Sequence, residues 1–249
     1  MSVLNPPQRE AIRYLDGPLL VLAGAGSGKT RVITEKIVYL IESCGFSPSN
    51  IAAITFTNKA AREMQTRVHR LLTGKPSRNL TISTFHALGV RILREDAGTL
   101  GYKPTFSILD SSDCFGIVSE LAGSTDKATI RKLQALISNW KSTLISPDEA
   151  RRNARDETET LAANAFASYS ATLQAYQAVD FDDLIALPVA LFESQPGVRD
   201  KWQNRLRYLL VDEYQDTNAS QYKLLKLLAG PRAAFTAVGD DDQAIYGWR

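Results

Sequence analysis

Short apolar runs alternate with longer helical patterns over the first third of the chain. Apolar runs typical of buried strands lie at residues 19–22, 51–55, 80–84, 207–212 and 233–239. Between the first three runs, residues 31–43 and 59–72 carry apolar side chains at the spacing of amphipathic helices. This alternation predicts an α/β fold with a parallel sheet and crossover helices.

The alternation stops after residue 84. From residue 85 to about 196, one helical pattern follows another, and Gly98, Gly101, Gly123 and Pro147 mark some of the breaks. Strand patterns resume at residue 207. The simplest arrangement is one α/β nucleotide-binding domain, made of residues 1–88 and 196–249, with an inserted all-helical subdomain of residues 89–195.

The first strand leads directly into a glycine-rich turn, and a helix follows. Strand, loop and helix in this order are typical of a phosphate-binding loop, whose backbone N–H groups surround phosphate oxygens. Lys29 would reach the β- and γ-phosphates, and the Thr30 hydroxyl would bind Mg²⁺. The alternative is a glycine turn with a chance Lys-Thr pair, which the flanking strand and helix disfavour. The loop consists of Ala23, Gly24, Ala25, Gly26, Ser27, Gly28, Lys29 and Thr30, with Ala23 where the usual pattern has glycine.

Two adjacent carboxylates, Asp212 and Glu213, follow a later apolar run. One can hold Mg²⁺ and the other can accept a proton from water, although such a pair can also mark a strand that reaches the surface. Beyond the last strand, the amide of Gln243 is suited to contact a γ-phosphate or to orient the attacking water. Because the carboxyl ends of parallel strands share one edge of a sheet, these loops should converge. The acidic neighbours Asp241 and Asp242 are interpreted as a solvated loop.

Composition limits the remaining classes of function. The net charge of the 249 residues is only +2, so a surface that binds nucleic acid must be local. The two cysteines, Cys44 and Cys114, are too few for a disulfide framework and fit a reducing cytosol. We expect a cytoplasmic protein without a membrane segment or a zinc site, because no apolar run is long enough and no Cys/His cluster occurs.

Seven short segments follow one another along the chain. They are Gln8, residues 23–30, Thr55-Phe56-Thr57-Asn58-Lys59-Ala60-Ala61-Arg62-Glu63-Met64, Thr84-Phe85-His86, Asp180-Phe181-Asp182-Asp183-Leu184, Asp212-Glu213-Tyr214-Gln215-Asp216 and residues 239–249. In this combination they resemble the N-terminal half of a superfamily 1 DNA helicase of the UvrD/Rep/PcrA type, over essentially the whole chain. Segments 25–34 and 137–141 look closest to the Rep branch.

The resemblance implies a RecA-like ATP-binding domain with ATP and Mg²⁺ as cofactors. Gln8 would hydrogen-bond adenine, although from the residues alone it could equally be a surface side chain. Arg31 would lie against the base or sugar of the nucleotide. Asp212 would hold Mg²⁺ with Thr30, and the catalytic residues would then be Glu213 as general base, Lys29 and Gln243.

The resemblance also implies a path for single-stranded DNA. The residues that match it are Phe56, Asn58, Thr84, His86, Tyr246, Trp248 and Arg249. Aromatic stacking suits a motor because it tolerates any base sequence. Alternatives stay open: Phe56 would by default be a core residue, and His86 a capping or surface residue. Asp180 has a local explanation as a helix cap, and Lys132 and Lys141 could touch duplex DNA or be ordinary surface charges.

The family continues beyond the motif at residue 249 with a second RecA-like domain, which supplies the arginines that stabilise the transition state. The resemblance therefore predicts the N-terminal half of an ATP-dependent 3′→5′ DNA helicase or translocase in replication or repair. Expected partners are single-stranded DNA, single-strand/duplex junctions, the C-terminal RecA-like domain, and replication or repair proteins. We expect the fragment alone not to unwind DNA. The alternatives are a passive nucleotide- or single-strand-binding module, and the helicase portion of a nuclease-helicase.

Overall fold

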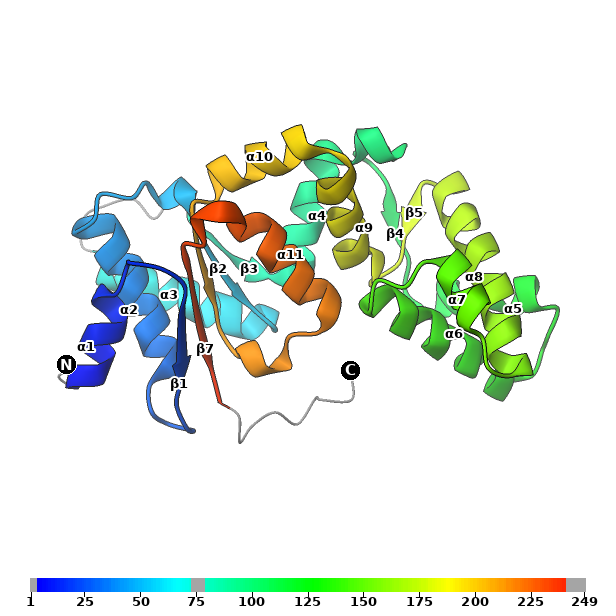
Figure 1. The fold of residues 1–249 in the computed structure, drawn as a ribbon, viewed down its shortest axis with the longest axis horizontal. Coiled ribbons are helices and arrows are strands. Elements are labelled where there is room, and N and C mark those ends of the chain that lie inside the picture. Colours follow the sequence, from blue (N-terminus) through cyan, green and yellow to red (C-terminus); the bar gives the residue numbers. More distant parts are fainter. Residues whose placement is uncertain (1–3, 73–78, 241–249) are drawn as a thin grey trace. The chain divides into compact units, whose positions relative to one another are not determined.

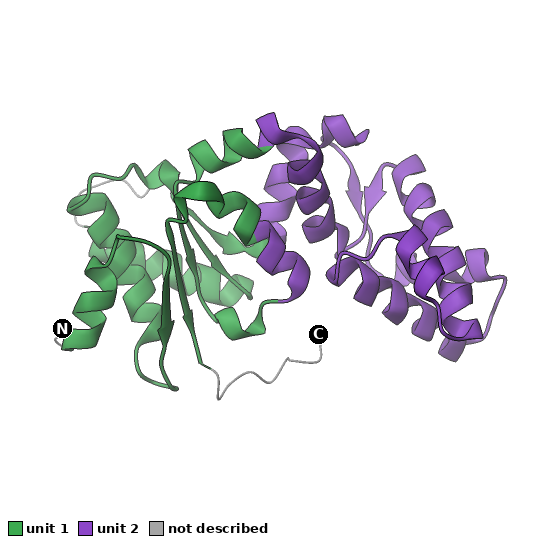
Figure 2. Ribbon diagram, viewed as in Figure 1, with its two compact units in different colours: residues 1–85, 199–217, 225–249 green, residues 86–198, 218–224 purple. Residues whose placement is uncertain are grey.

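The computed structural model describes residues 4–72 and 79–240 of the chain. The chain forms two compact units (Figure 2). Unit 1 comprises residues 1–85, 199–217 and 225–249, and unit 2 comprises residues 86–198 and 218–224. The predicted domain boundaries at residues 88 and 195 stay a prediction, because a contact boundary does not define an inserted domain.

Unit 1 contains a five-stranded sheet whose paired strands are all parallel. The strands are β1 (Leu19–Leu22), β2 (Ile51–Thr55), β3 (Thr81–Thr84), β6 (Tyr208–Val211) and β7 (Phe235–Gly239). Their order across the sheet is β1-β7-β6-β2-β3. The predicted α/β class and its five strands are confirmed, and three of the strands begin or end a residue or two inside the predicted bounds.

Helices α1 (Pro6–Arg13), α2 (Lys29–Glu42) and α3 (Asn58–Leu71) lie on one side of these strands in Figure 1. The apolar stripe of α2 packs against α3 and the sheet, and Ile33, Ile37, Leu40 and Met64 have no exposed surface. Parallel strands are normally covered by such helices, which explains why β2 and β6 are buried along their whole lengths. This core holds the strands of the sheet in place, and the candidate site described below lies at their carboxyl ends.

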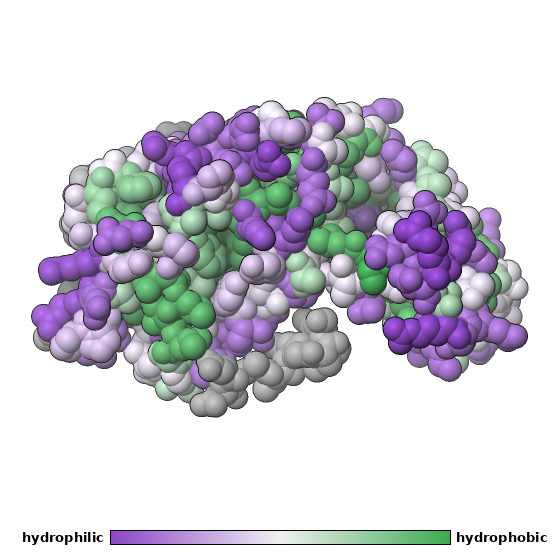
Figure 3. Space-filling model, in the orientation of Figure 1, coloured by the Kyte–Doolittle hydropathy of each residue, from purple (hydrophilic) through white to green (hydrophobic). Residues whose placement is uncertain are grey.

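Strand β1 differs from the predicted buried strand. Its four residues form the strand as expected, but Leu20 is 51% exposed and Leu22 is 58% exposed. The reason is its position, since β1 is an edge strand of the described sheet and only Leu19 and Val21 pack against the apolar clusters. Figure 3 shows an apolar surface area where Figure 1 places β1.

Unit 2 is mainly helical. Its helices include α5 (Ser111–Ala122), α6 (Lys127–Ser142), α7 (Pro147–Asn153), α8 (Glu157–Ala175) and α9 (Asp183–Ser194). The unit boundary falls near the start of α4 (Phe85–Asp96) and within α10 (Pro196–Arg205) and α11 (Ala219–Ala229). Both units also contain short 3₁₀ turns. Those in the described residues are Pro48–Asn50, Ala97–Leu100, Tyr214–Asp216 and Gly230–Arg232. No helix in the described part of the chain has the length and apolarity to cross a membrane.

The expectation of an all-helical insertion is corrected by a small parallel sheet in unit 2. Strands β4 (Ser107–Ile108) and β5 (Ala178–Val179) have two residues each and pair in parallel. Both are too short to produce an alternating pattern, and both residues of β4 are exposed. A pairing of this kind depends on contacts between distant segments, which the sequence pattern does not reveal.

A buried charge cluster in unit 2 contradicts one sequence interpretation. Lys141 is 5% exposed, and its Nζ lies 2.7 Å from Asp180 Oδ2 and 2.8 Å from Asp183 Oδ1. Burial alone would lower the pKa of Lys141, but the two carboxylates raise it above its ordinary value. The suggestion that Lys141 contacts duplex DNA is therefore wrong, whereas for the exposed Lys132 it stays a prediction. The N-cap of α9 is Asp182 rather than the predicted Asp180, and its side chain makes no capping hydrogen bond, although the backbone N–H of Asp183 donates to Asp180 Oδ1 at 2.9 Å.

Candidate nucleotide-binding site

The candidate site forms where three neighbouring strands of unit 1 end. The strand order places β7 between β1 and β6, and Leu22 is in register with Gly239. The backbone N–H of Ala23 also donates to the Gly239 carbonyl oxygen at 3.1 Å. The glycine-rich loop, Asp212 and Asp240 are thereby brought to the same sheet edge, as the sequence predicted for the loops after these strands.

The loop after β1 makes a tight turn into α2. Gly26 and Gly28 have φ values of 72° and 90°, in the left-handed region that glycine adopts without strain. Gly28 is the N-cap of α2, so the first backbone N–H groups of this helix face the loop. A pocket of about 300 Å³ lies here, and its lining residues are Ala25, Gly26, Ser27, Gly28, Lys29, Thr30, Arg31, Arg67 and Glu213. A concave site at a helix N-terminus is suited to anions such as phosphate.

Lys29 is held inside this site by three oxygen atoms. Its Nζ donates to the carbonyl oxygens of Ala23 at 2.7 Å and Gly24 at 3.3 Å. It also forms an ion pair with Asp240 Oδ2 at 2.9 Å. Both side chains are almost fully buried, at 9% and 4% exposure. The ammonium group is therefore anchored among oxygens that a phosphate oxygen could replace.

Thr30 and Asp212 form the second contact across the site. Thr30 Oγ1 donates to Asp212 Oδ2 at 3.2 Å, which joins the start of α2 to the end of β6. Burial and, to a smaller extent, the neighbouring charge of Glu213 together raise the pKa of Asp212 to about 6. A hydroxyl and a carboxylate side by side are oxygen ligands of the kind that Mg²⁺ prefers.

Glu213 occupies an unusual backbone position at the end of β6. Its φ of 53° lies in the left-handed region, which is uncommon for a residue other than glycine and is enriched at functional sites. Glu213 Oε2 accepts a hydrogen bond of 2.7 Å from Gln215 Nε2. The backbone conformation and the side-chain bond together orient the carboxylate, which lines the same pocket as Lys29.

Gln8 and Arg31 lie beside the loop. Gln8 Nε2 donates to the Ser27 carbonyl oxygen at 2.9 Å, and Gln8 also completes a capping box with Asn5 at the start of α1. Arg31 lines the pocket, and its Nε is 3.6 Å from Glu35 in the next helical turn. The structure therefore brings together all the predicted ATP and Mg²⁺ residues that it describes, and their roles stay predictions.

The chain matches the UvrD/REP helicase N-terminal domain family over residues 4–249. It belongs to this helicase family.

Two relatives of this helicase family are similar along the whole chain. ATP-dependent DNA helicase Rep of Escherichia coli is 52% identical over 249 residues, which cover 99% of this chain and 37% of that protein. ATP-dependent DNA helicase PcrA of Staphylococcus epidermidis is 44% identical over 250 residues, which cover 99% of this chain and 34% of that protein. The chain thus spans little more than a third of the length of these relatives.

Three residues of unit 1 that were predicted to contact DNA lie at or just after the ends of β2 and β3. Thr55 is in register with Thr84, which is buried. The half-buried Phe56 follows β2, and its ring centroid lies 5.4 Å from that of Phe85. Asn58 is exposed as the first residue of α3. Register therefore places Phe56, Asn58 and Thr84 at one edge, and contact with DNA stays a prediction for each.

His86 belongs to unit 2 and is neither a helix cap nor an isolated surface residue. Its ring stacks on Phe181 with the centroids 3.9 Å apart and an interplanar angle of 25°. Phe181 is 59% exposed. Burial lowers the pKa of His86 to about 4, so the imidazole is neutral at pH 7. The result is an aromatic pair with one exposed member.

Four predicted residues, Gln243, Tyr246, Trp248 and Arg249, lie outside the described residues. Sequence reasoning also missed residues that the structure places beside the predicted ones, namely Arg67, Gln215 and Asp240 in unit 1 and Phe181 in unit 2. Gln215, Asp240 and Phe181 lie within the recognised motifs, so motif membership was the available signal. Arg67 lies on α3 outside every motif and gave none.

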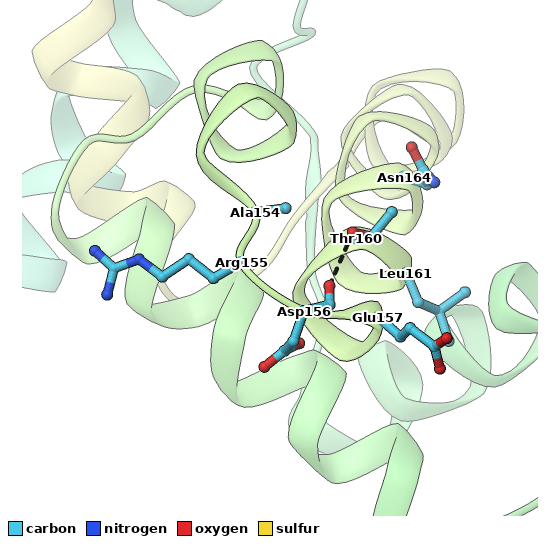
Figure 4. A pocket seen from close by; sticks show the side chains of 7 residues that line it. All are labelled: Ala154, Arg155, Asp156, Glu157, Thr160, Leu161 and Asn164. Atoms are coloured by element: carbon cyan, nitrogen blue, oxygen red, sulfur yellow. Dashed lines mark hydrogen bonds between the residues drawn. The ribbon is translucent and has the colours of Figure 1, made fainter.

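A larger pocket, of about 440 Å³, lies in unit 2 between the end of α7 and the start of α8. Figure 4 shows that Arg155 and Glu157 point in different directions, and the Thr160 hydroxyl donates to the Asp156 carbonyl oxygen at 2.8 Å. Because its polar groups do not converge, this pocket lacks the arrangement that a binding site needs.

Proposed function

We propose that this chain is the ATP-binding half of an ATP-dependent 3′→5′ DNA helicase or translocase that acts on single-stranded DNA. The observation that carries the proposal is the meeting of Lys29, the Thr30–Asp212 pair and Glu213 at one sheet edge. A passive nucleotide-binding module needs the phosphate loop but not an oriented carboxylate facing it. Family membership and the names of the relatives support DNA as the second substrate.

The residues fit Mg²⁺ and ATP. Thr30 and Asp212 offer one hydroxyl and one carboxylate within 3.2 Å of each other. No group of three or more His, Cys, Asp or Glu residues that could hold a metal occurs within residues 4–72 and 79–240. Mg²⁺ requires no such group, because it keeps water and phosphate oxygens as its other ligands. When bound, it neutralises charge on the phosphates.

The remaining steps belong to this chain's own residues. Lys29 exchanges the carbonyl oxygens and Asp240 for phosphate oxygens, and the helix N–H groups stabilise the negative charge that develops there. Glu213 accepts a proton from the water that attacks the γ-phosphorus, while the bond from that phosphorus to the bridging oxygen breaks and ADP leaves. Gln8 recognises the adenine from its position beside Ser27, and Gln243 contacts the γ-phosphate.

Single-stranded DNA follows aromatic side chains in this proposal. Phe56, Tyr246 and Trp248 stack on bases, and the exposed Phe181, supported by His86, offers a further stacking surface. Backbone contacts come from four residues, namely Asn58, Thr84, His86 and Arg249. Base stacking without base-specific hydrogen bonds suits translocation along any sequence.

The proposal extends to the whole protein. Its second RecA-like domain closes the ATP site with the transition-state arginines, so residues 1–249 alone hydrolyse ATP poorly and do not unwind DNA. We infer a cytoplasmic role in replication or repair at single-strand/duplex junctions, because these are where a DNA-unwinding motor acts.

Unwinding of tailed duplexes by the full-length protein tests this proposal. A duplex with a 3′ single-stranded tail should be unwound with Mg²⁺ and ATP, and a duplex with a 5′ tail should not. Lys29→Ala should abolish unwinding, while Lys127→Ala, which removes an exposed lysine from unit 2, should leave it unchanged. A preference for 5′ tails would refute the polarity, and unimpaired unwinding by Lys29→Ala would refute the motor site.

A further inference from the structure

The side chain of Gln215 joins the ends of β6 and β7. Its Nε2 donates to Glu213 Oε2 at 2.7 Å, and its Oε1 accepts from the backbone N–H of Asp240 at 3.1 Å. Asp240 in turn pairs with Lys29 at 2.9 Å. The side chain and the backbone N–H of Asp240 thus connect the lysine of the phosphate loop, through Gln215, to the carboxylate of Glu213.

Chemistry fixes the orientation of this amide. The backbone N–H of Asp240 is a donor and must face the amide oxygen. The carboxylate oxygen Oε2 of Glu213 is the acceptor and must face the NH₂ group. A side chain of the same length with two acceptors or two donors could not satisfy both neighbours. The two neighbours of residue 215 therefore require a side chain with one donor and one acceptor, as in a carboxamide.

The backbone of β7 leaves room for this contact. A Cβ atom added to Gly239 would lie 3.0 Å from Gln215 Oε1 and 3.6 Å from the Gln215 backbone nitrogen. The first distance is tighter than an ordinary contact, so alanine at this position would push the carboxamide away from its partners. The position of the Gln215 amide therefore depends on glycine at residue 239.

Gln215 restrains the side chain of Glu213, in addition to the left-handed backbone of that residue. Gln215 engages Oε2, and among the described residues Oε1 has no hydrogen-bond partner. A hydrogen bond from a neutral amide can fix the direction of a carboxylate without placing a further charge beside it. A general base benefits from being held in place.

We propose that Gln215 is a positioning residue that holds the carboxylate of Glu213 in register with the end of β7, so that Oε1 can take the proton of the hydrolytic water. This inference rests on the proposed function of Glu213 as the base. Through Asp240 the same amide links the base to Lys29, so the group that binds the phosphates and the group that activates water share one framework.

Steady-state ATP hydrolysis by the full-length protein, saturated with single-stranded DNA, tests this role. Gln215→Leu should lower kcat by about 10- to 100-fold, because small misplacements of a reacting group have effects of this size. The KM for ATP should stay within about threefold, because Gln215 does not line the phosphate pocket. Gly239→Ala should reproduce the loss of kcat while the glutamine is still present.

Gln215→Glu tests positioning in a second way. It keeps an oxygen for the Asp240 N–H but removes the donor to Glu213 and places another acidic group against it. Glu213 should then be displaced, so kcat should fall as far as in Gln215→Leu while the KM for ATP again stays within about threefold. Gln203→Leu is the matched control, since it removes a 2.7 Å amide hydrogen bond to Leu227 O elsewhere in unit 1 and should leave kcat within about twofold.

Glu213→Gln, measured in parallel, distinguishes the two possible failures. If Glu213→Gln keeps full turnover, the proposed base is wrong. If Glu213→Gln is inactive but Gln215→Leu and Gln215→Glu both keep kcat within about twofold, only the positioning role is overturned. Equal losses of kcat in Gln215→Leu and the Gln203→Leu control would also overturn it, because both changes would then act through the fold.

Discussion

Replacing Asp212 with asparagine should stabilise the protein while removing its activity. Asp212 is 3% exposed, and its pKa is raised from 3.8 to about 6 by burial and by the charge of Glu213. Because the folded pKa of this acid lies above the unfolded one, ionisation costs stability as the pH rises from about 4 through 6. A shift of about two units corresponds to about 3 kcal/mol when the group is fully ionised.

The advantage of Asp212→Asn should therefore depend on pH. At pH 7.5 the variant should gain about 3 kcal/mol, and at pH 5 about half of that, because folded Asp212 is then largely protonated. The amide oxygen can still accept from Thr30, so the cross-site hydrogen bond remains. Urea unfolding in EDTA at both pH values measures the difference. Asp200→Asn, at a side chain that is 64% exposed, is the control and should change stability by less than about 0.5 kcal/mol.

Added Mg²⁺ and ATP should reverse the order, because they stabilise the wild type by binding and Asp212→Asn lacks the metal carboxylate. An Asp212→Asn protein that is less stable than the wild type in EDTA, or whose advantage is the same at pH 5 and pH 7.5, would refute the reasoning about burial and charge at this site.

Three further predictions follow from buried contacts and exposed surfaces in unit 2. Lys141→Met should lower the free energy of unfolding by about 3–5 kcal/mol, because it leaves two buried carboxylates without their cation. Lys132→Met on the same helix is the control and should be nearly neutral, because Lys132 is exposed. Similar small effects of both changes in urea unfolding would contradict this. Gly89→Ala should lower the yield of folded protein, since a Cβ there would lie 1.7 Å from the Leu184 carbonyl oxygen, and a wild-type melting temperature would count against the packing described. Phe181→Ala should weaken binding of single-stranded DNA by about 1–3 kcal/mol in a fluorescence anisotropy titration, and an unchanged affinity would remove this ring from the DNA path.

The sheet of unit 1 could be predicted because local pattern and global fold agree there. Short apolar runs predicted the five strands, and the strand-loop-helix context predicted the phosphate loop. Parallel strands gather their carboxyl ends at one edge, so the convergence of the glycine-rich loop with Asp212 followed from topology alone. The hydrogen bond from Thr30 to Asp212 shows that the two loops do meet at this edge.

Features that depend on long-range contacts could not be predicted. The exposure of Leu20 and Leu22 follows from the place of β1 at the edge of the described sheet, which its apolar sequence does not reveal. The burial of Lys141 depends on carboxylates about forty residues away, and without them a lysine is assigned to the surface. Gln215 lies in a recognised motif, but the motif alone does not indicate its role. That role depends on the two hydrogen bonds that Gln215 makes in the folded chain.

The most direct test of the central claim is ATP turnover and ATP binding by the full-length protein with Glu213→Gln. The account predicts that turnover stimulated by single-stranded DNA falls by about 10²- to 10⁴-fold, the usual contribution of a general base, while the affinity for Mg²⁺ and ATP stays within about threefold. Unchanged turnover would contradict the account, because the oriented carboxylate at the end of β6 would then have no part in hydrolysis.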